Sequence, residues 1–207
     1  MSLLIERKIS LPTPRLQGKE VLTGPDPAVC KVKGVMFGGR RQFLLDTLGQ
    51  EGFTAFTEKL SPETRSYVRT PLASSWCEFS SLIELDRAIH DHLDADALLK
   101  MGAASAELGV GRIYRFLDST ELTQFFEKSA LFHDQYQKFG KVRFEKTTDG
   151  GRMIYSDYPC YSPIFCASAI GYFMEAILRH GGTSPSVTET KCQCRGDATC
   201  TYEMKWA

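Results

Sequence analysis

Cysteine residues near the C-terminus are the side chains whose type and spacing point most clearly to chemistry. Five of the seven cysteines lie between residues 160 and 200, and the densest stretch runs from Glu189 through Cys192 and Cys194 to Cys200. Thiolates combined with a carboxylate are donors that a tetrahedral zinc site uses. The spacing therefore predicts a metal site in this part of the chain.

A hairpin and a helix would supply the donors. Cys192 and Cys200 flank a seven-residue turn, so a hairpin brings one thiol from each strand together. Cys166 follows Ser162-Pro163, a helix start, where the positive end of the helix dipole favours thiolate. A fourth donor from Glu189 would complete the shell. A full shell leaves no position for substrate, so we expect a structural metal site.

Spacing alone leaves alternatives open. Free cysteine is among the most buried residue types, so these thiols can also be interpreted as small buried hydrophobes. Residues 189 and 192 lie on opposite faces of a regular strand, and their pairing requires a bulge or a strand end. Cys160 and Cys194 are competing ligands.

The elements that position these residues follow an irregular start. Residues 1–32 carry Pro12, Pro14, Pro25 and Pro27 without a sustained period, which indicates an N-terminal arm with a short strand at 3–9. Residues 33–207 form the predicted domain. Apolar spacing predicts helices ending at Gly49, starting at Ser61-Pro62, and over 82–93, 98–117 and 119–140. Several glycines in the 98–117 helix predict a central or dimer-forming face.

The hydrophobic period changes to two after residue 140. A hairpin is expected over 142–158 around Asp149-Gly150-Gly151, followed by a helix that starts at Ser162-Pro163 and closes at Gly181-Gly182. Two further strands are expected at 187–192 and 199–206. Helices therefore come first and a small antiparallel sheet with one helix follows, which predicts an α+β fold with helices packed on that sheet.

Composition excludes several function classes. The 25 Lys and Arg residues balance the 25 Asp and Glu residues, so no basic field favours nucleic acid. No apolar run reaches the roughly 18 residues of a membrane span, and the start lacks the pattern of a secretory signal. We expect a cytoplasmic protein with reduced thiols and no complete disulfide framework.

A family resemblance rests on Cys166-x4-Gly171-Tyr172, Glu189-x2-Cys192-x7-Cys200 and Trp206. This pattern resembles the 4-vinyl reductase domain family, most closely the sensory domains of phenol- and xylene-responsive bacterial activators. The resemblance implies a zinc ion held by Cys166, Glu189, Cys192 and Cys200. It also implies the fold of TRAPP vesicle-tethering subunits, which is dimeric with an apolar cavity.

Aromatic residues from converging elements would line such a cavity. The residues we assign to it are Phe132, Tyr136, Phe144, Tyr155, Tyr158 and Phe165. Aromatic rings can stack on a planar guest, although rings at helical spacing also serve simply as core. The chain departs from the activators upstream of Cys160, so the identity of the ligand does not transfer.

The resulting hypothesis is a zinc-containing sensor module that binds a small apolar or aromatic molecule. It would act in signalling through a homodimer or a separate effector protein, because the chain ends at Ala207. One alternative is a non-catalytic TRAPP-like adaptor. Another is a tetrapyrrole vinyl reductase or carrier, which the missing dinucleotide-binding motif and the full metal shell disfavour. We therefore expect no enzymatic activity and assign the four histidines no catalytic role.

Overall fold

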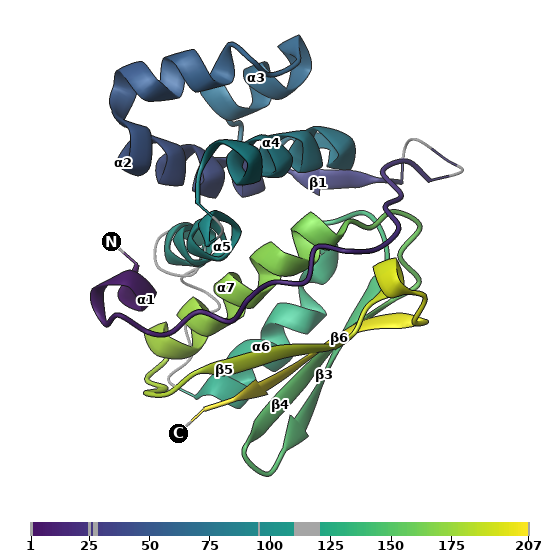
Figure 1. Cartoon of the computed structure of the whole chain (residues 1–207). Helices are drawn as coiled ribbons and strands as arrows, with labels where there is room; N and C mark the ends of the chain where they lie inside the picture. The colour runs from purple at the N-terminus through teal and green to yellow at the C-terminus, as the bar shows by residue number, and fades with distance from the viewer. Residues whose placement is uncertain (1, 25, 27–28, 95, 110–120, 207) are drawn as a thin grey trace.

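The computed structural model describes the chain except for residues 1, 25, 27–28, 95, 110–120 and 207 (Figure 1). Its helices are α1 (Leu3–Glu6), α2 (Val35–Thr57), α3 (Pro62–Arg69), α4 (Phe79–His92), α5 (Ala97–Leu108), α6 (Leu122–Leu131) and α7 (Pro163–Arg179), with 3-10 turns η3 (His133–Gln135) and η4 (Gln193–Arg195). Its strands are β1 (Lys31–Lys33), β2 (Trp76–Glu78), β3 (Lys141–Thr147), β4 (Gly150–Ser156), β5 (Ser186–Lys191) and β6 (Thr199–Lys205).

The described elements stack in layers. Helices α2, α3 and α4 lie together with the short β1-β2 ribbon, α5 and α7 lie in the middle, and a four-stranded sheet lies beyond them (Figure 1). The sheet has the order β3-β4-β6-β5 with antiparallel neighbours. The predicted α+β class is confirmed.

Glycines allow α5 and α7 to pack backbone to backbone. A Cβ atom on Gly102 would lie 2.0 Å from the carbonyl oxygen of Ser168, and one on Gly171 would lie 2.0 Å from that of Leu99. The glycine-bearing face of α5 is therefore central, as one of the two interpretations held, and it meets another helix of the same chain. Helix α5 ends at Leu108, and residues 110–117 of the predicted helix lie outside the described residues.

In the C-terminal half, the capping and turn signals of the sequence predict the elements correctly. The Oγ of Ser162 accepts a hydrogen bond from the backbone N–H of Ile164, and Pro163 occupies the first turn, so α7 begins where predicted. The predicted hairpin is β3-β4, with Thr147 opposite Gly150. Strands β5 and β6 are the last two predicted strands.

Two sequence predictions were wrong because distant contacts outweigh local pattern. The expected strand at 3–9 is helix α1, whose leading N–H groups donate to the carboxylate of Glu175. The expected helix over 119–140 stops at Leu131. Beyond it the chain pairs with β1, because Lys33 N donates to the Tyr136 carbonyl at 2.8 Å and Lys138 N to the Lys31 carbonyl at 3.0 Å.

The described residues among the first thirty run along the folded body rather than away from it. We call the described residues between 2 and 30 the N-terminal strap. Its path crosses α7 between α1 and the β1-β2 ribbon (Figure 1). Lys19 N donates to the carbonyl of Cys194 at 2.7 Å, and Val21 and Tyr161 exchange backbone hydrogen bonds of 2.9 and 2.7 Å. The strap therefore touches both the C-terminal loop and the connection before α7.

The buried apolar residues form two clusters. One joins the helical layer, with Phe37, Leu44 and Phe79 at its centre, and the other joins α7 to the sheet around Phe126 and Tyr202. A cavity lies where the two clusters meet. Among the described helices, none combines the length and apolarity needed to cross a membrane.

Candidate functional site

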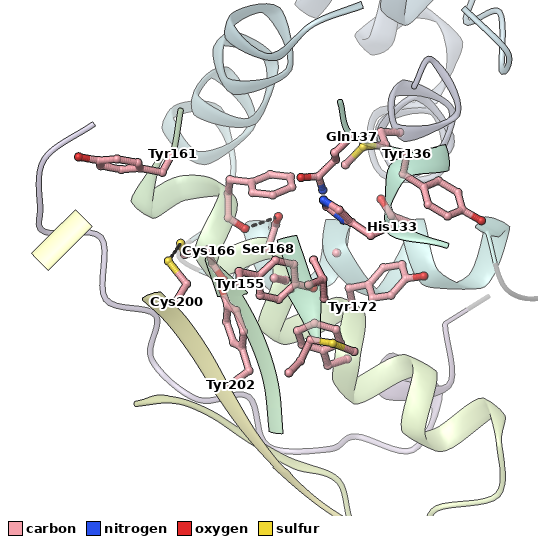
Figure 2. Close-up of a pocket in the computed structure, with 18 of the residues that line it drawn as sticks. His133, Tyr136, Gln137, Tyr155, Tyr161, Cys166, Ser168, Tyr172, Cys200 and Tyr202 are labelled. Carbon is pink, nitrogen blue, oxygen red and sulfur yellow. Dashed lines mark hydrogen bonds between the residues drawn. The ribbon is translucent and has the colours of Figure 1, made fainter. Parts of the chain in front are cut away.

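A cavity of about 200 Å³ lies between the helical layer and the sheet (Figure 2). Helix α2 contributes Met36 and Arg40 to its lining, α5 contributes Ser105, and α7 contributes Ser168 and Tyr172. Strands β3, β4 and β6 close the other side. Most of the lining surface is apolar, with a few polar groups, which is the usual make-up of a small-molecule pocket.

Four of the six predicted ligand-binding residues line the described cavity, and two do not. Those that line the cavity are Tyr136, Tyr155, Tyr158 and Phe165, whereas Phe132 and Phe144 are absent from the described lining. The Phe144 ring stacks on Phe126 with centroids 5.7 Å apart, and Phe132 packs against the sheet cluster. For Phe132 the difference follows from the early end of α6 at Leu131.

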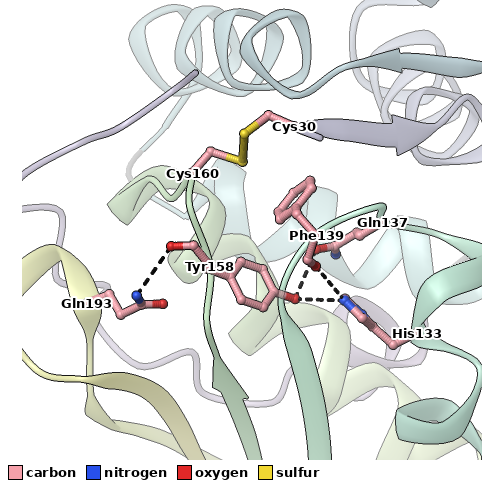
Figure 3. Close-up of a disulfide and its surroundings, with 7 residues drawn as sticks. All are labelled: Cys30, His133, Gln137, Phe139, Tyr158, Cys160 and Gln193. Carbon is pink, nitrogen blue, oxygen red and sulfur yellow. Dashed lines mark hydrogen bonds between the residues drawn. A yellow bond between two sulfur atoms is a disulfide. The ribbon is translucent and has the colours of Figure 1, made fainter. Parts of the chain in front are cut away.

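A buried hydrogen-bond network centred on His133 forms one wall of the cavity (Figure 3). His133 Nε2 lies 3.0 Å from the carbonyl oxygen of Phe139, so this nitrogen carries the proton and donates. The Tyr158 hydroxyl lies 3.2 Å from Nε2 and donates to Gln137 Oε1 at 3.1 Å. Burial lowers the pKa of His133, with the Phe139 carbonyl opposing that shift, so the ring is neutral at pH 7.

A buried ion pair forms another part of the lining. Arg40 Nε and Nη2 donate to the two carboxylate oxygens of Asp86 at 2.6 and 2.7 Å, and Nη1 donates to the Met36 carbonyl at 3.0 Å. Arg40 is 3 % exposed and Asp86 is fully buried. Burial raises the pKa of Asp86, and Arg40 opposes that rise. The pair presents no net charge to the cavity.

Sequence reasoning missed several polar side chains of the cavity, among them Arg40, His133, Gln137, Ser168 and Tyr172. The sequence offered one signal for them. A polar residue inside an apolar helical pattern needs a hydrogen-bond partner when it is buried. Their partners lie up to 46 residues away, as for Arg40 and Asp86. No local pattern reports such a distance.

The four predicted metal ligands lie together beside the cavity. One donor atom from each of Cys166, Glu189, Cys192 and Cys200 lies within 4.8 Å of every other, and all four residues are buried. The Cys166 sulfur is 3.9 Å from that of Cys200 and 3.8 Å from that of Cys192. The register between β5 and β6 shifts between Glu189 and Lys191, which is the bulge that this grouping requires.

Glu189 has one carboxylate oxygen without a hydrogen-bond partner among the described residues. Its Oε2 accepts from Arg195 Nη1 at 2.9 Å, whereas its buried Oε1 accepts from none of them. Burial, followed by the nearby Cys192, raises the pKa of Glu189 to about 7 against the opposing effect of Arg195. An unsatisfied buried carboxylate oxygen is costly unless a proton or a cation binds it.

The thiols of the cluster share protons unequally. Hydrogen bonding from Cys166, and then from Cys194 and Cys200, lowers the pKa of Cys192. Hydrogen bonding with Cys166 and Cys192 raises the pKa of Cys200. A cation that binds these sulfur atoms would have to displace the protons that the thiols hold.

Cys160 and Cys194, the two alternative metal ligands, lie in different surroundings. Cys194 lies beside the cluster, where it is close enough for Cys166 and Cys192 to shift the pKa of its thiol. Cys160 instead forms a disulfide with Cys30, with Cα atoms 6.3 Å apart (Figure 3). The expectation that all thiols are reduced is therefore corrected. The partners are 130 residues apart, and such pairing cannot be deduced from sequence. The other five cysteines are free and buried.

Comparison with known proteins identifies the fold and no family. No family model matches the chain, and no curated protein matches it. An H-NOX protein from S. oneidensis in the Fe(II)NO ligation state has a TM-score of 0.67 at 14 % identity, over 84 % of this chain and 99 % of that one. An NMR structure of the Shewanella oneidensis SO2144 H-NOX domain in the Fe(II)CO state gives 0.65 at 15 %, over 84 % and 98 %. An unliganded Fe(II) H-NOX protein mutant from K. algicida gives 0.63 at 13 %, over 84 % and 96 %. The chain has the H-NOX fold.

These findings correct two expectations from the sequence. The assignment to the 4-vinyl reductase domain family and to TRAPP-like proteins is wrong, because the structural neighbours are H-NOX proteins and no family model matches. The zinc cofactor is overturned with it, since the similar structures contain Fe(II) and a further one was solved to probe heme distortion in the H-NOX family. The motif that carried the resemblance occupies only the C-terminal part of the chain.

The described cavity does not fit a haem group. Its volume of about 200 Å³ lies below the roughly 300–1,000 Å³ of pockets for drug-sized ligands, and a haem is larger than such a ligand. Arg40 is the only described Lys or Arg in the lining, and its guanidinium is already paired with Asp86, so it is not available to a propionate.

Proposed function

We propose that this chain is a sensor module that binds a small, mostly apolar molecule in the cavity between its helical layer and its sheet. The observation that carries the proposal is an interior cavity walled by aromatic rings and by buried polar groups, of which His133 and Arg40 bond within the protein. The H-NOX fold supports it, because two structures with this fold are of proteins in the Fe(II)NO and Fe(II)CO ligation states. The binding domain would comprise residues 33–207, with residues 1–32 as an arm.

The ligand class follows from the size and lining of the cavity. About 200 Å³ suits a molecule of one or two rings, with room for few polar atoms. The rings of Tyr155, Phe165 and Tyr172 offer stacking surfaces, each worth ~0.5–1.5 kcal/mol beyond burial. Phe132 and Phe144, which we predicted as ligand contacts, would act by supporting the sheet wall.

Signalling rather than catalysis is the proposed output. Two titratable groups of the described lining serve structural bonds: His133 bonds to Phe139, and Arg40 bonds to Asp86. Ligand binding would therefore act by shifting the population of a state that a homodimer partner or a separate effector protein recognises. The free energy by which the ligand shifts this equilibrium is limited to the difference between its binding free energies for the two states.

We also infer that Cys166, Glu189, Cys192 and Cys200 bind a metal ion that stabilises the β5-β6 hairpin against α7. Support comes from the mutual proximity of the four donors and from the unpartnered Oε1 of Glu189. Elemental analysis of purified protein identifies the ion. Cys192→Ser should lose the ion and lower the melting temperature, whereas Cys77→Ser, at a buried thiol outside the cluster, should retain it. A metal-free protein with unchanged stability in Cys192→Ser contradicts the assignment.

Native mass spectrometry of protein purified from its own host tests the sensor function. We expect a co-purified small molecule, and an absorbance spectrum without a haem Soret band. Ala169→Phe places a ring inside the cavity and should abolish binding, whereas Ala55→Phe, on an exposed turn of α2, should leave it unchanged. Stoichiometric haem, or equal ligand retention in the two variants, overturns the proposal.

A further inference from the structure

The Cys30–Cys160 disulfide joins the two layers at the rim of the cavity (Figure 3). Cys30 directly precedes β1 of the helical layer, and Phe79 N donates to its carbonyl at 3.0 Å. Cys160 lies between β4 and α7 and contributes to the cavity lining. A single covalent bond thus connects the segment that leads into α2 with the segment that leads into α7.

Noncovalent contacts around this bond are sparse on the strap side. Between residues 5 and 29, no described residue of the N-terminal strap is buried. The polar contacts of the strap near the disulfide are the backbone pair of Val21 with Tyr161 and the bonds of Glu20 to Ser162 and Arg87. Leu22 and Val29 add apolar packing against the helical layer, but both stay partly exposed. Segments with few buried contacts open at low free-energy cost, so the covalent bond contributes much of the attachment here.

We propose that the Cys30–Cys160 disulfide is a redox-sensitive clamp on the cavity. In the oxidised form it holds the β1 end of the helical layer to the connection between β4 and α7. In the reduced form this rim opens more often, and ligand exchange accelerates. The inference rests on the proposed function for its ligand, whereas the opening itself is a property of the protein alone.

The chemistry of the clamp is thiol–disulfide exchange with a dithiol reductant. A thiolate of the dithiol attacks one sulfur, forming a mixed disulfide and releasing the other cysteine as a thiol. The second thiol of the reductant then displaces the remaining cysteine and leaves as a cyclic disulfide. Two electrons and two protons pass to Cys30 and Cys160. Cys30 is 3 % exposed and Cys160 fully buried, so exchange requires the rim to open first.

Hydrogen–deuterium exchange on the full chain tests the clamp without any ligand. Alkylation of the unfolded, unreduced protein should modify five cysteines, and all seven after reduction. Dithiothreitol should accelerate amide exchange at residues 29–33 and 158–162 by about tenfold, with the centre of α7 unchanged. In the double variant Cys30→Ser with Cys160→Ser, the same amides should exchange at the fast rate with or without the reductant. Cys77→Ser should respond as the wild type does.

The outcomes separate the clamp from the sensor function. Seven alkylated cysteines before reduction, or unchanged exchange at the rim on reduction, overturn the clamp. If the double variant does not fold, oxidised and reduced wild type still decide the question. A second arm follows release of the fluorescent probe 1-anilinonaphthalene-8-sulfonate, expected about tenfold faster on reduction. Absence of probe binding, with redox-dependent exchange intact, contradicts the sensor function and leaves the clamp standing.

Discussion

The backbone N–H of Leu4 donates a 2.9 Å hydrogen bond to Oε2 of Glu175, a fully buried carboxylate in the middle of α7. The same carboxylate accepts from Ser2 Oγ at 2.8 Å, Leu3 N at 3.0 Å and Arg179 Nε at 2.8 Å. Three of these four donors belong to the first residues of the chain. The start of the N-terminal strap therefore satisfies a buried charge on the helix that lines the cavity.

Glu175→Gln should destabilise the protein by about 1–3 kcal/mol, because an amide presents one acceptor oxygen and turns its N–H₂ group toward backbone donors. Urea unfolding measures the loss. Glu203→Gln is the matched control, since Glu203 pairs with Arg152 on a half-exposed strand face and should cost no more than ~1 kcal/mol. Equal losses in the two variants would show that the Glu175 contacts add nothing specific.

Asp86→Ala should cost about 3–5 kcal/mol, because it leaves the Arg40 guanidinium buried and uncompensated. The double variant Arg40→Met with Asp86→Leu removes both charges and should recover most of that loss. Chemical denaturation of the two proteins provides the comparison. A double variant as unstable as Asp86→Ala would mean that packing, and not the unpaired charge, dominates at this position.

Gly171→Ala should destabilise the α5–α7 contact by about 1–3 kcal/mol or more, since its Cβ would lie 2.0 Å from the Leu99 carbonyl oxygen. Gly38→Ala is the control, because its nearest neighbour is the end of the flexible Leu108 side chain at 3.3 Å. Thermal melts distinguish the two. A neutral Gly171→Ala would disprove the close approach of these helices.

Stability should fall as the pH is lowered through about 6.5 because of His133. Burial lowers the pKa of His133 below its ordinary value of 6.5 in the folded state, so the unfolded chain binds a proton first. Between the two pKa values, stability therefore rises with pH, and above 6.5 this contribution is constant. His133→Gln keeps a donor for the Phe139 carbonyl and removes the titration. Unfolding free energies from pH 5 to 8 should show a shallower slope for the variant, and parallel curves would contradict the assignment.

Local pattern predicted the elements near the C-terminus because their signals are short-range. Ser162-Pro163 places the start of α7, and Asp149-Gly150-Gly151 places the β3-β4 turn, since capping and turn preferences act over a few residues. The same pattern failed at residues 3–9 and beyond Leu131. There, distant partners, Glu175 for the first and β1 for the second, decide the conformation.

The sequence by itself determined the α+β class, the order of the elements after residue 140, and a group of candidate thiols and a carboxylate near the C-terminus. The resemblance drawn from that last motif led to the wrong family, because a few residues in one segment report local geometry and not the whole architecture. Only the tertiary structure decided that Cys160 pairs with Cys30, that Arg40 and His133 face a cavity, and that this cavity does not fit a haem. The physical reason is that such contacts depend on how whole layers pack, and packing joins residues whose separation along the chain carries no local signal.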